Sequence, residues 1–220
     1  MIKVSLVALS IAMSLTAALP AVGQMGETSV SKTGTVQQPS DYALSTADFF
    51  PEKTQTESTY IAAESPSDAM RKINMVNELR KAGIHVGTMA KVNYGPCKIV
   101  AAGFHARESG NYETGGFKST TYCTQKVSSI KHSSQARFKR LAWWVKGGPE
   151  ISESTTKIKP GKYKKISYPA LFTQKNHQFS CKSSKRTTWS GRTLGTIVYN
   201  GKTYYADAYA PVQKDVPCRL

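Results

Sequence analysis

The sequence is short of acidic residues. It holds 14 Asp and Glu against 30 Lys and Arg, which gives a formal net charge of +16 at pH 7. The paired carboxylates that glycoside cleavage requires are therefore scarce. Glu108 and Glu113 flank a predicted turn, where we expect two acids to be solvated rather than paired for catalysis. The acids that follow Asp68 are Glu78, Glu108, Glu113, Glu150, Glu153, Asp207 and Asp215.

Other catalytic and metal-binding patterns are missing as well. The chain has no Gly-x-Ser-x-Gly elbow and no Gly-rich loop with the spacing that cradles a phosphate. The four His are scattered and no two Cys stand at ligand spacing, so we expect no metal and no cofactor. A Ser-His-Asp triad built from distant residues, such as His105 or His132 with Asp207, is an alternative, because such a site leaves no local motif.

Long apolar runs are absent except at the N terminus. Met1-Ile2-Lys3 gives a short basic start, Val4 to Leu19 carries no charge, and Pro20 ends the run. Ala21-Val22-Gly23 places small residues first and third before a cut. The sequence thus predicts a signal peptide at residues 1–23, cleaved after Gly23, and a secreted, extracellular protein. A retained anchor is the alternative, but a membrane-spanning helix needs roughly 20 apolar residues, more than this run supplies.

Cysteine is rare but even in number. The four Cys are Cys97, Cys123, Cys181 and Cys218. An even count in an exported chain predicts two disulfides, which leave no free thiol to act as a nucleophile. Three pairings are open. We favour Cys97 with Cys123 and Cys181 with Cys218, because each pair brackets a local strand-rich block.

The charge is unevenly distributed along the chain. Residues 24–68 contain two bases and seven acids, a net of −5, whereas residues 69–220 contain 27 bases and seven acids, a net of +20. Residues 24–64 are rich in Ser, Thr, Gln and Glu without a hydrophobic period, which predicts a disordered acidic leader or pro-segment. Tyr60-Ile61 is one of its few apolar spots and a candidate to dock on the domain. Residues 65–220 are expected to form a basic, β-rich domain.

One helix and many short strands are predicted in that domain. Residues 66–82 carry an apolar stripe at helical spacing, with Ser65 as N-cap and Gly83 closing the last turn. Asn200-Gly201, between two strand-like runs, is a strong hairpin signal. The pattern predicts a mainly β fold, an antiparallel β-sandwich or barrel-like domain with one N-terminal α-helix, linked by disulfides. The candidate strands are residues 89–94, 98–107, 120–128, 137–146, 163–172, 178–182, 194–199 and 203–209.

Basic residues gather around the tryptophans of this domain. Neither face of the predicted strand 137–146 is purely apolar, so at least one of Trp143 and Trp144 is expected near the surface. Cationic surfaces attract polyanions, and adjacent aromatic rings stack on sugars or bases. The alternative is that the charge only keeps the protein soluble and that the Trp side chains are core. The predicted binding residues are Arg137, Lys139, Arg140, Trp143, Trp144 and Lys146 in one cluster and Lys182, Lys185, Arg186, Trp189 and Arg192 in another; a third cluster is Lys157, Lys159, Lys162, Lys164 and Lys165.

These observations predict a secreted, non-enzymatic binding or interaction protein. Its expected partner is an anionic surface or polymer, such as a cell-wall polymer, lipid headgroups or an acidic glycan, and peripheral membrane contact is compatible with the composition. No specific nucleic-acid partner is expected, because the protein is exported and shows no nucleic-acid motif. A toxin or antimicrobial protein masked by its acidic pro-segment is one alternative, and a secreted hydrolase with a dispersed site is another. The sequence does not set the oligomeric state.

Overall fold

A computed structural model describes residues 56–83, 92–107 and 111–219 of the protein. The chain divides into two units, Met1–Gln38 and Pro39–Leu220, and every described residue belongs to the second. The predicted signal peptide, its cleavage site and most of the predicted leader lie outside the described residues, as does the first half, 89–91, of the predicted strand 89–94. The predicted fold class is confirmed, because the described chain is mainly antiparallel β with one helix and two disulfides.

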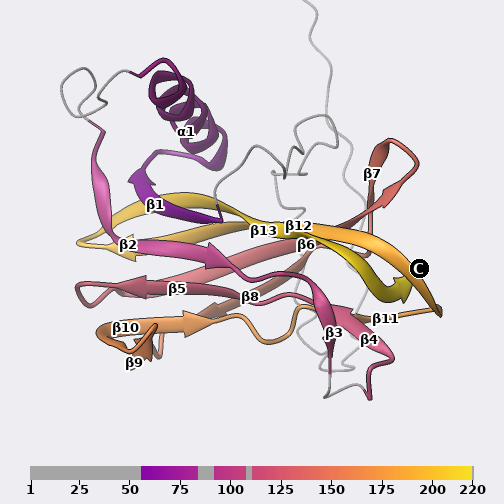
Figure 1. Ribbon diagram of the computed structural model, residues 1–220. Helices are drawn as coiled ribbons and strands as arrows, with labels where there is room; N and C mark the ends of the chain where they lie inside the picture. Colours follow the sequence, from indigo (N-terminus) through magenta and orange to yellow (C-terminus); the bar gives the residue numbers. More distant parts are fainter. Residues whose placement is uncertain (1–55, 84–91, 108–110, 220) are drawn as a thin grey trace, which may run out of the picture. The chain divides into compact units, whose positions relative to one another are not determined.

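The strands form one large sheet and one small one (Figure 1). Along the large sheet the order is β7-β6-β12-β13-β1-β2-β5-β10-β9, with β8 paired to the other part of β6, and the small sheet has the order β11-β4-β3. Each strand runs antiparallel to its neighbours. The strands are β1 Glu57–Ala62, β2 Tyr94–Ala101, β3 His105–Arg107, β4 Thr114–Gly116, β5 Ser119–Cys123, β6 Ser129–Arg140, β7 Trp143–Lys146, β8 Ile151–Thr155, β9 Lys159–Tyr163, β10 Ile166–Thr173, β11 Gln178–Ser180, β12 Ser183–Tyr199 and β13 Lys202–Arg219.

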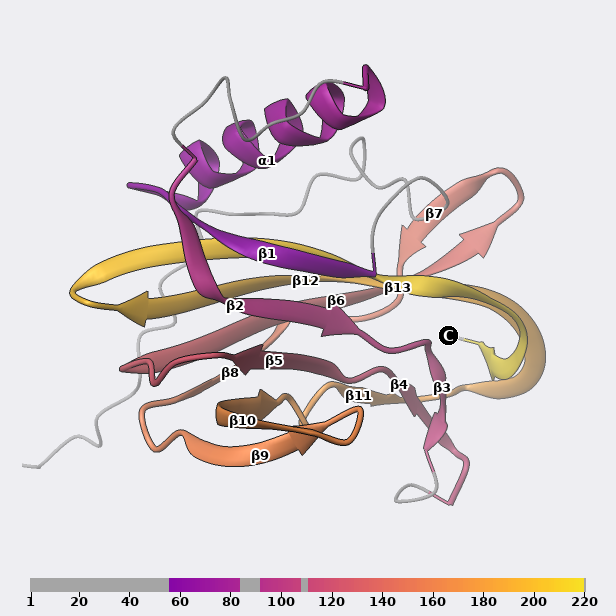
Figure 2. The same ribbon diagram turned by 60° about the vertical axis from the view of Figure 1, so that its left-hand side comes forward.

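A long hairpin of β12 and β13 lies in the middle of the large sheet. Its turn is the predicted Asn200-Gly201, with φ of 48° and 71°, the left-handed geometry that an Asn-Gly hairpin turn requires. Both strands extend well past the predicted 194–199 and 203–209, because register shifts between Thr187 and Gly191 let them bend and stay paired. Figure 2 shows this bend at the end of the hairpin away from the turn.

The sheet curls so that its far strands turn back toward β8. Just beyond β10, the Gln174 side-chain amide donates to the Ile151 carbonyl at 2.9 Å, and the Lys175 amide donates to the Glu153 carboxylate at 2.8 Å. The result is an incomplete barrel with an enclosed inner face. Tyr60, Ile99, Phe117, Ile130 and Ile197 are among the buried side chains that fill it.

The β-rich domain begins earlier than residue 65. Residues 57–62, which the sequence pattern places in the leader, form β1 between β13 and β2. Tyr60 is fully buried, and its hydroxyl lies 2.6 Å from that of Thr121. The predicted boundary at 64/65 is therefore too late. The sequence does not predict this strand because it contains few apolar residues: only the side chains of Tyr60 and Ile61 are buried.

The helix matches its prediction closely. It is α1, Pro66–Lys81, and the Ser65 hydroxyl accepts the Asp68 amide at 3.1 Å as an N-cap. Ile73 and Val76 pack against Ile61 of β1 in a small apolar cluster. Among the described residues, no helix has both the length and the apolar character that a bilayer crossing demands.

Residues 137–146 form a hairpin instead of the single predicted strand. β6 ends at Arg140 and β7 begins at Trp143, and Arg140 pairs with Trp143 across a two-residue turn. Leu141 in this turn has a φ of 56°. The sequence does not predict this turn, because Leu141-Ala142 includes no Gly, Asn or Asp, the residues that normally mark a turn. Figures 1 and 2 both show the hairpin projecting from the sheet.

Both favoured disulfide pairings are confirmed. Cys97 on β2 is bonded to its cross-strand partner Cys123 on β5. Cys181, between β11 and β12, is bonded to Cys218 near the end of β13. The Cys218 carbonyl also accepts the Trp189 indole N–H at 2.8 Å. This second disulfide therefore fixes the bent end of the β12–β13 hairpin next to the small sheet.

Replacing Cys181 and Cys218 together by Ala should lower the free energy of unfolding by about 3–4 kcal/mol, since the bond closes a loop of 37 residues. Urea unfolding of the oxidised protein and of the double variant measures the difference. An equal midpoint for the two proteins would contradict a stabilising role for this bond.

Candidate functional site

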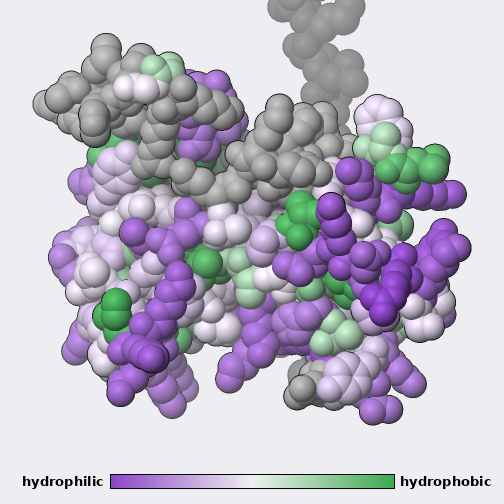
Figure 3. Space-filling view, in the orientation of Figure 1, coloured by the Kyte–Doolittle hydropathy of each residue, from purple (hydrophilic) through white to green (hydrophobic). Residues whose placement is uncertain are grey.

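The β6–β7 hairpin exposes apolar and basic side chains together. We call this region the hairpin tip and define it as Lys139, Arg140, Leu141, Ala142, Trp143, Trp144 and Lys146. Leu141 is 92% exposed and Trp143 is 76% exposed. Figure 3 shows hydrophobic atoms gathered at the upper right, where Figure 1 places this hairpin, with hydrophilic side chains beside them. Large apolar side chains at a projecting turn contribute little to a core.

The backbone conformation of this turn is also unfavourable for the residue that occupies it. Leu141 adopts a left-handed φ of 56°, a conformation that a residue with a Cβ reaches at a cost of about 1 kcal/mol or more. Hairpin turns usually place Gly, Asn or Asp at such positions. Leu141 therefore contributes no buried surface to the fold and adopts its backbone conformation at a cost. This combination points to a role outside folding.

The cations of the hairpin tip surround these apolar residues. Arg140, Lys146 and Lys139 are exposed, and the Lys139 ammonium lies 5.9 Å from the centre of the Trp144 ring. Trp144 itself is half-buried. An arrangement of this kind can meet a surface that has negative charge outside and an apolar layer beneath, because each group finds its complement there.

Trp189 of the second predicted cluster is fully buried instead of exposed. Its ring stacks on Phe104 with centroids 4.2 Å apart, and it also contacts Phe138 and Phe179. The surface prediction for this tryptophan is therefore wrong. The reason is that Phe104, Phe138 and Phe179, which are distant in the sequence, cover its ring, and sequence spacing alone does not reveal them.

Two of the predicted binding arginines are buried as well. Arg137 is 0% exposed and Arg192 is 3% exposed. The Arg192 Nε donates to the Asp207 carboxylate at 2.7 Å, and its guanidinium lies 5.2 Å from the Tyr209 ring. The surface prediction for these two residues is thus also wrong. Asp207 was the available signal, since an acid within the apolar run of β13 calls for a buried cation opposite it.

The remaining residues of the second cluster are exposed. Lys182, Lys185 and Arg186 are on the surface near the start of β12. The Arg186 guanidinium donates to the Asp215 carbonyl at 2.9 Å, which engages it within the fold. Sequence proximity to Trp189 therefore does not produce a tryptophan-lysine site here.

Part of the third cluster gathers at a second exposed turn, whereas Lys157 precedes β9 and lies away from it. We call it the lysine turn and define it as Lys159, Lys162, Lys164, Lys165 and Ile166. All five side chains are exposed, Ile166 to 58%. Lys164 and Lys165 have φ of 48° and 68°, and the Lys164 ammonium lies 5.4 Å from the centre of the Tyr163 ring.

A hydroxyl-rich network occupies part of the enclosed inner face. The Thr121 hydroxyl lies 2.7 Å from His132 Nε2 and 2.6 Å from the Tyr60 hydroxyl. Ser134 and Thr193 are linked nearby at 2.6 Å. All of these side chains are fully buried, so the network is closed to substrates in this conformation.

A dispersed hydrolase site would need a carboxylate in the same network. Asp207 projects from the opposite face of the sheet, because its neighbours Ala206 and Ala208 are the residues that point into the core. Among the described residues, no hydrogen bond joins His132 to a carboxylate. No cluster of His, Cys, Asp and Glu in the described part of the chain could hold a metal ion.

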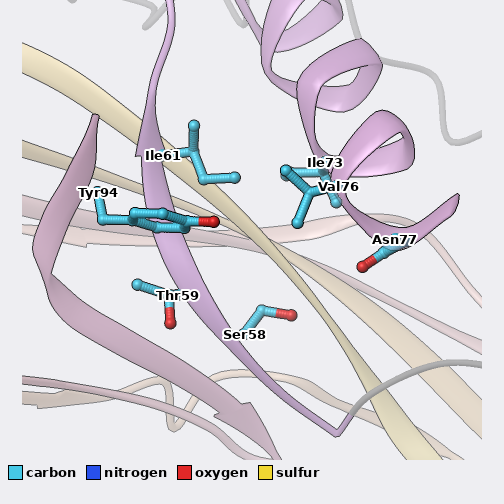
Figure 4. Close-up of a pocket in the computed structure, with 7 residues that line it drawn as sticks. All are labelled: Ser58, Thr59, Ile61, Ile73, Val76, Asn77 and Tyr94. Atoms are coloured by element: carbon cyan, nitrogen blue, oxygen red, sulfur yellow. The ribbon is translucent and has the colours of Figure 1, made fainter. Parts of the chain in front are cut away.

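Two depressions lie on the β1–β2 side of the sheet. The one shown in Figure 4, between α1 and β1, measures about 20 Å³ and is lined by Ile61, Ile73 and Val76 among others. That volume is close to what a single water molecule needs. A wider, shallow groove of about 380 Å³ lies beside it, lined by Lys98, Tyr122 and Tyr168 among others. The Lys98 ammonium is already paired with the Glu57 carboxylate at 3.1 Å.

The conformational strain at Leu141 gives a stability prediction. Leu141→Asn should raise the free energy of unfolding by about 0.5–1 kcal/mol, because Asn tolerates the left-handed region and no buried contact is lost. Ala142→Asn is the matched control, since Ala142 has no positive φ, and it should give no such gain. Urea unfolding measures both variants. A clear loss of stability in Leu141→Asn would show that this leucine supports the fold.

The two buried histidines predict acid sensitivity. Burial lowers the pKa of His132 to about 3, and burial together with repulsion from Arg107 lowers the pKa of His177 to about 4. Both stay neutral in the folded state while the unfolded chain protonates them near pH 6.5. Stability should therefore be constant above about pH 6.5 and fall toward pH 4, by up to about 1.4 kcal/mol per pH unit for each histidine.

Unfolding in urea across this pH range measures the slope. His177→Leu should make the slope between about pH 6.5 and pH 4 shallower by roughly half, because one of the two proton-linked groups is removed. An unchanged slope in that variant would exclude His177 as a contributor.

Comparison of the chain with models of protein families, with curated proteins and with solved structures gives no significant match. The function is therefore argued from the chemistry of the hairpin tip.

Proposed function

We propose that this protein is a secreted, non-enzymatic binding protein that contacts anionic surfaces through the hairpin tip. The observation that supports this most is the exposure of Leu141 and Trp143, at 92% and 76%, beside the exposed Arg140 and Lys146. The two disulfides are compatible with an oxidising, extracellular compartment. The predicted signal peptide supports the same location.

The apolar part of the hairpin tip favours lipid headgroups over a soluble polymer. A Leu side chain that leaves water gains about 1.5–3 kcal/mol, and each cation near an anionic leaflet adds about 1 kcal/mol. Tryptophan is enriched at membrane interfaces because its ring is apolar and its N–H is polar. A polysaccharide offers the charge but no apolar layer for Leu141. The apolar and electrostatic contributions together are large enough for reversible, peripheral membrane binding.

Co-sedimentation of the exported protein with vesicles tests the proposal. Binding to vesicles that contain anionic phospholipid should exceed binding to zwitterionic ones. It should weaken as salt rises from about 0.1 M to about 1 M, over which the Debye length falls from ~10 Å to ~3 Å. Binding that does not respond to salt or to lipid charge would overturn the electrostatic basis.

Variants of the hairpin tip separate its two contributions. Leu141→Asn with Trp143→Ser should reduce vesicle binding by about tenfold or more, because both apolar contacts are lost. Arg140→Gln with Lys146→Gln should reduce it by roughly fivefold per charge. The matched controls are Met75→Ser, an exposed apolar residue on α1, and Lys118→Gln with Lys175→Gln, two exposed lysines elsewhere. Wild-type binding by both tip variants would overturn the proposal, and binding only to soluble acidic glycan would make that polymer the partner.

A further inference from the structure

The lysine turn resembles the hairpin tip in composition. Each is a two-residue hairpin turn that exposes an aliphatic side chain next to cations, Leu141 in one and Ile166 in the other. Lys164 and Lys165 both adopt left-handed φ values, 48° and 68°, where the β12–β13 hairpin uses Asn200-Gly201. Two lysines in a turn that favours Asn-Gly carry a conformational cost without any burial in return.

Few acids are placed to neutralise the lysine turn. The sequence has no Asp or Glu between Glu153 and Asp207. Glu57 on β1 is one carboxylate that interacts with the turn: burial opposes the shift, but hydrogen bonds from Tyr122 and Lys98, with the charges of Lys98 and Lys164, lower its pKa. Glu57 already forms an ion pair with Lys98 at 3.1 Å. The turn therefore keeps an excess of positive charge.

The two exposed turns lie at opposite ends of the strands, as the register across the sheet shows. The hairpin tip follows Arg140 at the end of β6, whereas the lysine turn shares its end of the sheet with Ser129, at the start of β6. Figures 1 and 2 both place β7 high and the β9–β10 turn low.

This separation is large compared with electrostatic screening. β6 has 12 residues, so its two ends are ~36 Å apart at about 3.3 Å per residue. The Debye length at physiological salt is ~8 Å, so the charges of the two turns are screened from one another.

We propose that the protein bridges two anionic lipid surfaces, with the hairpin tip on one and the lysine turn on the other. This inference rests on the proposed function of the hairpin tip and adds a second contact. A monomer suffices, because both contacts belong to one chain. A bilayer fits the lysine turn better than a soluble polyanion does, since exposed Ile166 gains by leaving the water at a lipid interface.

A two-surface capture experiment tests the bridge. The exported protein is bound to a supported bilayer with anionic phospholipid, unbound protein is washed away, and fluorescent vesicles of the same composition are added. The first step measures binding and the second measures bridging. We expect the wild-type protein to retain the vesicles, and high salt to release them.

The test variant is Lys162→Gln with Lys164→Gln and Lys165→Gln. Each cation at an anionic surface contributes roughly fivefold, so vesicle capture should fall by on the order of 100-fold while binding to the first bilayer persists. The matched control removes three exposed lysines outside both turns, Lys118, Lys175 and Lys214, also to Gln. It has the same net charge and should still capture vesicles. Thermal unfolding of both variants verifies that they are folded.

The outcomes separate the two proposals. Capture by wild type and control but not by the test variant supports the bridge. Equal capture by the test variant overturns it and indicates self-association of bound protein. Wild-type binding to the first bilayer without capture also overturns the bridge and leaves the proposed function standing. No binding to the first bilayer overturns both.

Discussion

The rest of the structure depends on the pairing of β12 with β13. This hairpin pairs with β6 through β12 and with β1 through β13, so both halves of the large sheet are attached to it. Small residues on its inner side, Gly195 and Ala206 among them, make room for large side chains from other strands. A Cβ at Gly195 would overlap the Tyr60 hydroxyl. These small residues allow the sheet to curl and allow Tyr60 of β1 to lie close to β12.

The same pairing separates the basic residues into two groups. On the central strands, Arg192 is enclosed and neutralised by Asp207 beneath α1, where its guanidinium also approaches Met70. At the edges of the sheet, lysines project from turns into water. A high net charge is thus compatible with the fold because most of the described cations are exposed, and water and salt screen their repulsion.

Those turns combine charged and exposed aliphatic side chains. Their residues also adopt backbone conformations that are unfavourable for side chains of these types. Leu141, Lys164 and Lys165 all have left-handed φ values, and none is buried. Unfavourable backbone geometry that brings no packing gain is more easily explained by an external partner than by folding. The closed hydroxyl network around His132, by contrast, is explained by the hydrogen bonds that its buried hydroxyls make within the curl.

The sequence by itself predicted the elements that depend on residues close together in the chain. Ser65 and the apolar period defined α1, Asn200-Gly201 defined the central turn, and spacing within strand-rich blocks identified both disulfides. Only the tertiary structure decided which side chains are covered. β1 is a strand because β13 and β2 pair with it, and Trp189 is core because Phe104, Phe138 and Phe179 cover its ring. Burial depends on the partners that long-range pairing supplies, and the sequence of one strand does not contain them.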